Sequence, residues 1–195
     1  MAAEAAGWIF LGTFRILKDL YGGPAFQQVI ADTLPGTQQV FAEKIRFLGW
    51  YPYSCYADLL RAIQRQLEKK EGEICRRLGE ASGRASLKKT FRVYKEIGDP
   101  ERLILSSSKV WNKHFRGAGK LETVSALPEN TRWRILGFDE MCAAHCLLHA
   151  GWLKGGLSEA ASSVGMELVT DPVETACTRN GAPHHEFFCT WKYKT

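Results

Sequence analysis

Apolar residues recur at helical spacing through the first 116 residues of the chain. Leu11, Phe14, Leu17 and Leu20 follow one another at three-residue steps, which places them on one face of a helix. Glycine and proline residues then punctuate the pattern and mark where helices end. We expect helices over residues 7–22, 24–34, 38–48, 71–82 and 86–97, with two more opening after Ser54 and after Asp99-Pro100.

The hydrophobic period changes after Gly117. Residues 120–128 and 131–138 alternate as strands do, and a long helix is expected over 139–164. Two further strand stretches, 166–169 and 173–179, precede a turn at Asn180-Gly181 and a last strand over 184–193. The pattern predicts an α+β fold in which a helical N-terminal half packs on an antiparallel sheet with one long helix. We expect a single domain over 1–195, with N-terminal helices at 1–48 and a core at 49–195.

Composition and charge narrow the class of protein. The hydrophobic share of 45% and the charged share of 24% are typical of a globular chain. The net charge of +5 is spread out, and the densest basic cluster, 84–95, alternates with apolar residues as a solvated helix face does. We therefore expect no nucleic-acid partner. With no secretory signal and no apolar run of membrane-spanning length, the expected location is the cytoplasm, where cysteines serve as thiols or metal ligands.

Four of the six cysteines and four of the five histidines lie between Cys142 and Cys189. On the long helix, Cys142, Cys146 and His149 share one face. The turn at Asn180-Gly181 folds Cys177 and His185 back toward each other. Two thiolates and one imidazole from among these residues, together with the Glu174 carboxylate, make a set that suits a tetrahedral zinc ion. The alternative is that the cysteines are small buried hydrophobes, because the chain has no Cys-x-x-Cys pair.

The same residues provide a weak case for catalysis. Cys142 or Cys146 could act as a nucleophile beside His145 or His149, but a packed helix face holds such a pair away from a substrate. The chain has no phosphate-binding loop, dinucleotide fingerprint or nucleophile elbow. Its Gly151–Gly156 glycines stand inside a helix and indicate close packing. We expect no catalytic residues and a binding protein rather than an enzyme.

Short motifs over residues 45–192 recur in an order found in a known family. They are Trp50-Tyr51-Pro52, Asp99-Pro100-Glu101-Arg102-Leu103, Val110-Trp111 with Phe115, Cys146-Leu-Leu-His-Ala-Gly-Trp152 with Gly155, Glu174-Thr-Ala-Cys177, Arg179, Gly181, Glu186-Phe187 and Trp191. In these the chain resembles the 4-vinyl-reductase-type ligand-binding domain and its poorly characterised relatives in myxobacteria and other bacteria. The resemblance implies the fold shared by nitric-oxide-sensing haem domains and Golgi tethering subunits.

The resemblance also implies a function and a site. Carried over by position, its zinc ligands are Cys146, Glu174, Cys177 and His185, where His185 replaces the cysteine that is common in the family. It implies a sensor for an aromatic or hydrophobic molecule, with candidate pocket walls at Phe91, Tyr94, Trp111, Phe115 and Trp133.

Zinc is the cofactor implied by the resemblance. The absence of a Tyr-x-Ser-x-Arg signature argues against haem, although His114, His145 and His149 could each be drawn as an axial ligand. A protein partner or a homodimer would receive the signal. The alternative is a scaffold or assembly partner that uses its helical face and takes no ligand.

Overall fold

The computed structural model describes residues 2–68, 72–88, 98–161 and 163–195. Its largest sheet has the strand order β4-β5-β8-β7, and all its neighbours are antiparallel. The strands are β4 (Lys120–Leu127), β5 (Asn130–Leu136), β7 (Val173–Ala176) and β8 (His185–Cys189). The expected α+β class with an antiparallel sheet is confirmed.

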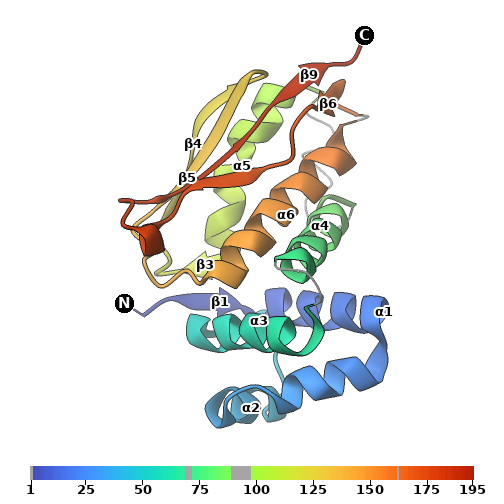
Figure 1. Ribbon diagram of the computed structural model, residues 1–195, viewed down its shortest axis with the longest axis vertical. Coiled ribbons are helices and arrows are strands. Elements are labelled where there is room, and N and C mark those ends of the chain that lie inside the picture. Colours follow the sequence, from blue (N-terminus) through green and yellow to red (C-terminus); the bar gives the residue numbers. More distant parts are fainter. Residues whose placement is uncertain (1, 69–71, 89–97, 162) are drawn as a thin grey trace.

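Helices cover one face of this sheet. Helix α5 (Pro100–His114) and helix α6 (Ala143–Ala160) lie against it, and α4 (Glu73–Lys88) packs on α6 (Figure 1). Trp133 and Ile135 on β5 and Phe187 on β8 are fully buried, and Arg132, Arg134 and Glu186 point to the opposite face. Because successive side chains of a strand point to opposite faces, the three apolar residues face the helices and form the core between the layers.

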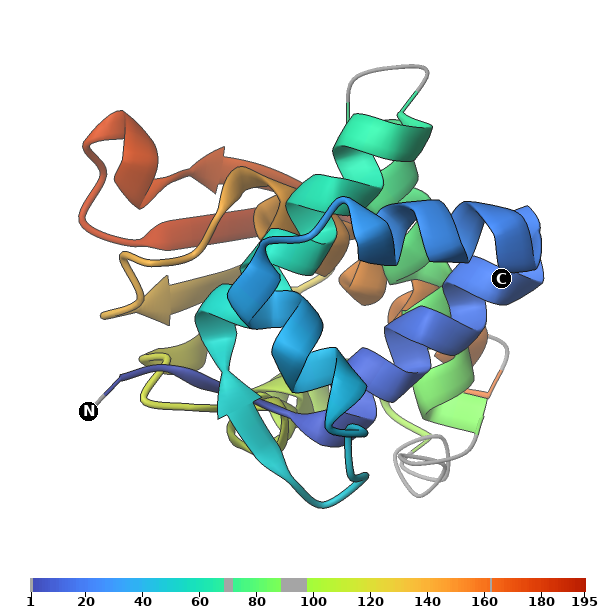
Figure 2. The ribbon, with the colours of Figure 1, turned by 90° about the horizontal axis from the view of Figure 1, so that it is seen from below.

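A second layer closes the base of the molecule (Figure 2). It contains α1 (Gly7–Ala31), α2 (Pro35–Ala42), α3 (Tyr53–Leu67) and a small sheet in the order β2-β1-β3, made of Trp50–Pro52, Glu4–Ala6 and Phe115–Arg116. Strand β3 directly follows α5, so this small sheet joins the base to the upper layer.

Helices α4 and α6 approach each other with backbone against backbone. A Cβ atom added at Gly151 would lie 2.1 Å from the carbonyl oxygen of Arg76, and one at Gly79 would lie 2.0 Å from that of Leu148. Gly83 and Gly155 are equally constrained, by the carbonyl oxygens of Trp152 and Glu80. The close packing expected for the glycines of the long helix is confirmed at Gly151 and Gly155, but not at Gly156, where an added Cβ atom would make only ordinary contact.

Several element boundaries differ from the expected ones. Within Gly7–Ala31 the chain leaves the helical conformation at Gly22, whose φ is 84°, so the break expected between two helices at Gly22-Gly23-Pro24 is confirmed. Helix α4 continues through the break expected at 83–85 because Gly83 fits against α6 there, and residues 89–97 lie outside the described part of the chain. Helix α6 is shorter than 139–164, whereas the cap of α5 by Asp99 is confirmed by its bond from the Arg102 amide at 3.2 Å.

The C-terminal strand is divided in two. Strand β8 ends at Cys189, and β9 (Trp191–Tyr193) pairs with β6 (Met166–Leu168) in a separate ribbon. The amide of Trp191 donates to Pro128 at the turn between β4 and β5, which directs β9 out of the main sheet. Strand β1 was not expected, because Glu4–Ala6 carries no strand pattern and its pairing comes from distant residues.

Candidate functional site

A cavity of about 400 Å³ lies between the base layer and the upper helices. Its walls come from α1, α3, α4, α5 and α6, and they are mostly apolar. The lining residues are Trp8, Ile9, Leu11, Gly12, Arg15, Ile16, Phe47, Tyr56, Ser82, Ala85, Ser86, Ser107, Val110, Trp111, His114, Phe115, Leu121, His145, Leu148, His149 and Trp152. A cavity of this volume and lining is of the kind that holds small molecules in proteins.

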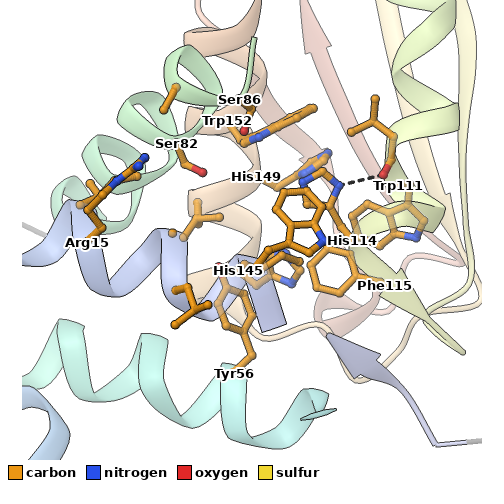
Figure 3. Close-up of a pocket in the computed structure, with 18 of the residues that line it drawn as sticks. Arg15, Tyr56, Ser82, Ser86, Trp111, His114, Phe115, His145, His149 and Trp152 are labelled. Atoms are coloured by element: carbon orange, nitrogen blue, oxygen red, sulfur yellow. Dashed lines mark hydrogen bonds between the residues drawn. The ribbon is translucent and has the colours of Figure 1, made fainter. Parts of the chain in front are cut away.

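Three histidines stand in the cavity wall, and all three are held neutral (Figure 3). Burial lowers the pKa of His149 to about 3, with repulsion from His114 and His185 adding to the effect. Burial also lowers the pKa of His114 to about 4, although the bond to the Val110 carbonyl opposes it. The pKa of His145 falls well below its ordinary value, mainly through burial. At neutral pH each imidazole therefore keeps a lone pair and one N–H.

Two buried polar atoms of the cavity walls have no hydrogen-bond partner among the described residues. They are Nε2 of His149 and Nε1 of Trp152, on side chains one turn apart along α6. The two rings are stacked at a centroid distance of 6.0 Å and an interplanar angle of 11°. An unpartnered buried polar group costs about 1–3 kcal/mol, and most native proteins avoid it. Both residues line the cavity, so a ligand there could supply the missing partners.

The polar groups at the other end of the cavity lie on α1 and α4. Arg15 is exposed to solvent, and Ser82 and Ser86 stand across from it (Figure 3). Arg15 is the one charged side chain among the described residues that line the cavity. The site therefore runs from an aromatic and imidazole end inside the molecule to a cationic end at its mouth.

The five predicted wall residues have different outcomes. Trp111 and Phe115 line the cavity, with their rings 4.6 Å apart. Phe91 and Tyr94 lie outside the described residues. Trp133 is fully buried and borders a separate small cavity of about 50 Å³, with its Nε1 donating to the Ser107 hydroxyl at 2.9 Å. Sequence reasoning missed Arg15, Trp8 and Trp152 as wall residues, because only the tertiary packing of α1 on α4 and α6 places them there.

The four residues predicted as metal ligands come together on the other side of α6. The donor atoms of Cys146, Glu174, Cys177 and His185 all lie within 4.8 Å of one another. Nδ1 of His185 is 2.8 Å from the Glu174 carboxylate and 3.5 Å from Sγ of Cys146. Cys146 belongs to the start of α6, Glu174 to β7 and His185 to β8, so the terminal hairpin does close over the long helix.

The chemistry of the cluster is that of a closed four-ligand site. Four donors around a zinc ion at 2.0–2.3 Å are separated from one another by roughly 3.3–3.8 Å, so small shifts suffice to bring these atoms to one centre. Nε2 of His185 is bonded to the Thr178 hydroxyl at 3.0 Å, which orients the ring as outer-shell partners of metal-bound histidines do. Burial and the neighbouring Glu174 carboxylate raise the pKa of the Cys146 thiol. A cation bound here would reverse that effect.

Known structures share this arrangement of elements. No family model and no curated protein matches the chain. An Fe(II) unliganded H-NOX protein from K. algicida matches with a TM-score of 0.69 at 11% identity, over 97% of each chain. An H-NOX protein from S. oneidensis in the Fe(II)NO state matches with a TM-score of 0.65 at 14% identity, over 96% of this chain and 99% of that one. The chain has the H-NOX fold.

The likeness corrects two of the expectations. The fold shared with nitric-oxide-sensing haem domains is confirmed, but no comparison supports the 4-vinyl-reductase-type or myxobacterial family. The prediction from the sequence favoured zinc and argued against haem as the cofactor, and its rejection of haem was wrong. The H-NOX neighbours are haem domains, and the likeness to them points to haem. One of these similar structures concerns the modulation of haem redox potential by porphyrin distortion. The rejection of haem rested on the missing Tyr-x-Ser-x-Arg signature. It did not take into account the cavity that five helices form around His145 and His149.

Among the described residues, no helix combines the length and the apolar character needed to cross a membrane.

Proposed function

We propose that this protein is a small-molecule sensory domain that binds a flat, mostly apolar ligand between α1, α4, α5 and α6. The observation that carries the proposal is the pair of unpartnered buried atoms, Nε2 of His149 and Nε1 of Trp152, in the walls of a cavity of about 400 Å³. A ligand that offers an acceptor to Trp152 and a donor or a metal to His149 would remove both penalties. A scaffold without a ligand gives these atoms no partner, which favours binding over the scaffold alternative.

Haem is the ligand of first choice, and the residues present fit it. An imidazole that stays neutral can act as an axial ligand, and His149 is the residue that we propose for this role. Trp111, Phe115 and Trp152 offer flat aromatic surfaces that exclude water. Arg15, with Ser82 and Ser86 near it, can pair with carboxylates that point out of the mouth. Haem, when bound, supplies an iron atom whose remaining coordination position can take a small ligand.

We further propose that Cys146, Glu174, Cys177 and His185 hold a divalent ion such as zinc as a structural site. Four protein ligands leave no open coordination position, so this metal would stabilise the fold rather than take part in a reaction. It would join α6 to β7 and β8, and α6 also carries His149. The ion would therefore hold in place the helix that forms the cavity wall. A cytoplasmic location and a protein partner or homodimer that receives the signal stay predictions of the sequence.

The experiment is a haem titration followed by absorption spectroscopy. We expect the wild-type protein to bind haem stoichiometrically, with a Soret band of histidine-ligated haem. The His149→Ala variant should lose that ligation and weaken haem binding by at least about tenfold, equivalent to about 1.4 kcal/mol. His184→Ala is the matched control, because His184 is not among the lining residues of the cavity.

The possible outcomes distinguish binding of haem from binding of another small molecule in the cavity. An unchanged spectrum in His149→Ala would refute the role of His149. Binding of an apolar fluorescent probe such as anilinonaphthalene sulfonate at the cavity, without haem binding, would keep the small-molecule function and remove haem. If neither molecule binds the wild-type protein, the proposed function is wrong.

A further inference from the structure

Tyr53 connects the start of α6 to the cavity through its hydroxyl group. The backbone N–H of Cys142 donates to the Tyr53 oxygen at 3.2 Å. The same hydroxyl lies 3.0 Å from Nδ1 of His145 and 3.8 Å from Sγ of Cys142. Since the oxygen already accepts from an amide, its own hydrogen is free to be donated. The hydroxyl can donate to the Cys142 sulfur or to Nδ1 of His145, and the shorter distance and the stronger nitrogen acceptor favour donation to Nδ1.

Tyr53 keeps its proton, and His145 stays neutral. Burial strongly raises the pKa of Tyr53, so the phenol remains a donor. His145 is 1% exposed and is surrounded by the rings of Tyr56, Trp111 and Phe115, where a charged imidazole would be costly.

A neutral imidazole that accepts at Nδ1 carries its hydrogen at Nε2. Among the hydrogen bonds of the described residues, the His145 ring makes only the one to Tyr53. His145 lines the cavity, whereas Tyr53 stands behind it, outside the cavity lining. The Nε2–H group is therefore a donor that awaits an acceptor.

We infer that Tyr53 holds His145 as the Nε2–H tautomer, so that the cavity presents a fixed, neutral N–H donor to its ligand. The part that concerns the ligand rests on the proposed function. It adds one requirement to the ligand, which must present a hydrogen-bond acceptor to the Nε2–H group of His145. Tyr53 is then a positioning residue, and His145 determines specificity.

The two histidines of the inner wall thus have different tasks. No hydroxyl fixes the tautomer of His149, whose Nε2 is without a partner in the described part of the chain. His149 can offer either a lone pair or an N–H, and His145 offers an N–H alone. Metal ligation by His145 at Nε2 would require the Tyr53 bond to break or its hydrogen to move.

The first test needs no ligand. Long-range ¹H–¹⁵N spectra of the labelled wild-type protein distinguish a protonated from an unprotonated ring nitrogen, with the His145 signals assigned by their loss in His145→Phe. We expect Nδ1 of His145 to be unprotonated and Nε2 to be protonated. In Tyr53→Phe, whose folding is checked by circular dichroism, the two tautomers should mix. An Nδ1–H tautomer in the wild-type protein would overturn the inference.

The second test compares acetophenone with ethylbenzene, which have nearly the same shape and differ in the carbonyl acceptor. We expect the wild-type protein to bind acetophenone more tightly by about tenfold, because only acetophenone offers an acceptor to the Nε2–H group of His145. His145→Phe should abolish this preference, and Tyr53→Phe should reduce it. Equal affinities in the wild-type protein would refute the role of His145. If neither probe binds, the ligand part of the inference is refuted, whereas the haem titration still decides the proposed function and the tautomer measurement decides what Tyr53 does.

Discussion

Alanine substitutions at two neighbouring glycines of α6, Gly155 and Gly156, test how closely the helix that carries His149 packs against α4. A methyl group at Gly155 would lie 2.0 Å from the carbonyl oxygen of Glu80, with the carbonyl carbon and Cα of Glu80 within 3.0 Å. A methyl group at Gly156 would lie 3.7 Å from Cδ1 of Leu87, which is ordinary contact. Gly156 also borders the small cavity of about 50 Å³, so its methyl group enters open space. The two alanine variants share the same gain in helix propensity and differ in packing alone.

The magnitude follows from the geometry. Gly→Ala inside a helix gains about 1 kcal/mol from propensity, which Gly156→Ala should retain. In Gly155→Ala the obstacle is backbone, so α4 and α6 must separate by roughly 1.4 Å to restore ordinary contact. Overpacking of this kind costs about 1–3 kcal/mol or more, and the loss of the close helix contact adds to it. We expect Gly155→Ala to lower the free energy of unfolding by about 2 kcal/mol net of the propensity gain, at the upper end of the overpacking range because the obstacle is backbone.

Thermal unfolding followed by circular dichroism measures both variants. For a chain of this length about 1 kcal/mol corresponds to a shift of roughly 2–4 °C, so Gly156→Ala should melt a few degrees higher than the wild-type protein and Gly155→Ala clearly lower. Haem affinity should fall in Gly155→Ala as well, because a displaced α6 moves His149 and Trp152. If both variants melted at the same temperature and above the wild-type protein, α4 and α6 would not approach each other backbone to backbone.

Three further predictions concern the metal cluster, the sheet and a helix cap. Zinc in hundredfold excess over its Kd should stabilise the wild-type protein by about 2.7 kcal/mol and the Cys177→Ser variant far less, as measured by thermal melts with and without chelator. The Cys55→Ala variant is the control and should keep the response, because its thiol lies outside the cluster. Melting of the wild-type protein that does not depend on zinc would contradict the site. Burial opposes ionisation of Glu186, but hydrogen bonds from Arg134, Thr175 and Arg132 outweigh it and hold the pKa of Glu186 below the ordinary value. The ionised Glu186 therefore stabilises the fold at pH values above the carboxyl pKa of the unfolded chain. This stabilisation is lost as the pH falls through the lowered pKa of the folded protein. Glu186→Gln should therefore be less stable than wild type at neutral pH and lose less stability on acidification, and parallel pH profiles in urea unfolding would count against this. Asp99→Ala should cost about 1 kcal/mol through loss of the α5 cap, and an unchanged urea midpoint would refute the cap.

The sequence was most informative where one local pattern decides the structure. The Asp99-Pro100 pair predicted the start of α5, and alternation around Trp133 predicted which face of β5 is buried. The turn at Asn180-Gly181 predicted that Cys177 and His185 lie close together, whereas the full set with Cys146 and Glu174 came from the family resemblance. Whether a metal occupies the group depends on affinity, which the pattern does not determine.

The cavity lay beyond the reach of the sequence pattern. Its walls join five helices, and their aromatic residues have the same spacing as ordinary core residues. Trp133 and Trp111 look alike in sequence, yet Trp133 packs fully and Trp111 borders the cavity, because only tertiary packing distinguishes them. The strand Glu4–Ala6 was missed for the same reason, since its partners lie near residues 51 and 115.

A crystal structure of the protein grown with haem tests the central claim most directly. We predict electron density for one haem per chain inside the cavity, with a nitrogen of His149 bound to iron and the carboxylates directed toward Arg15. Density only on the surface, or a cavity that stays without haem while His149 and Trp152 remain unpartnered, would contradict the account.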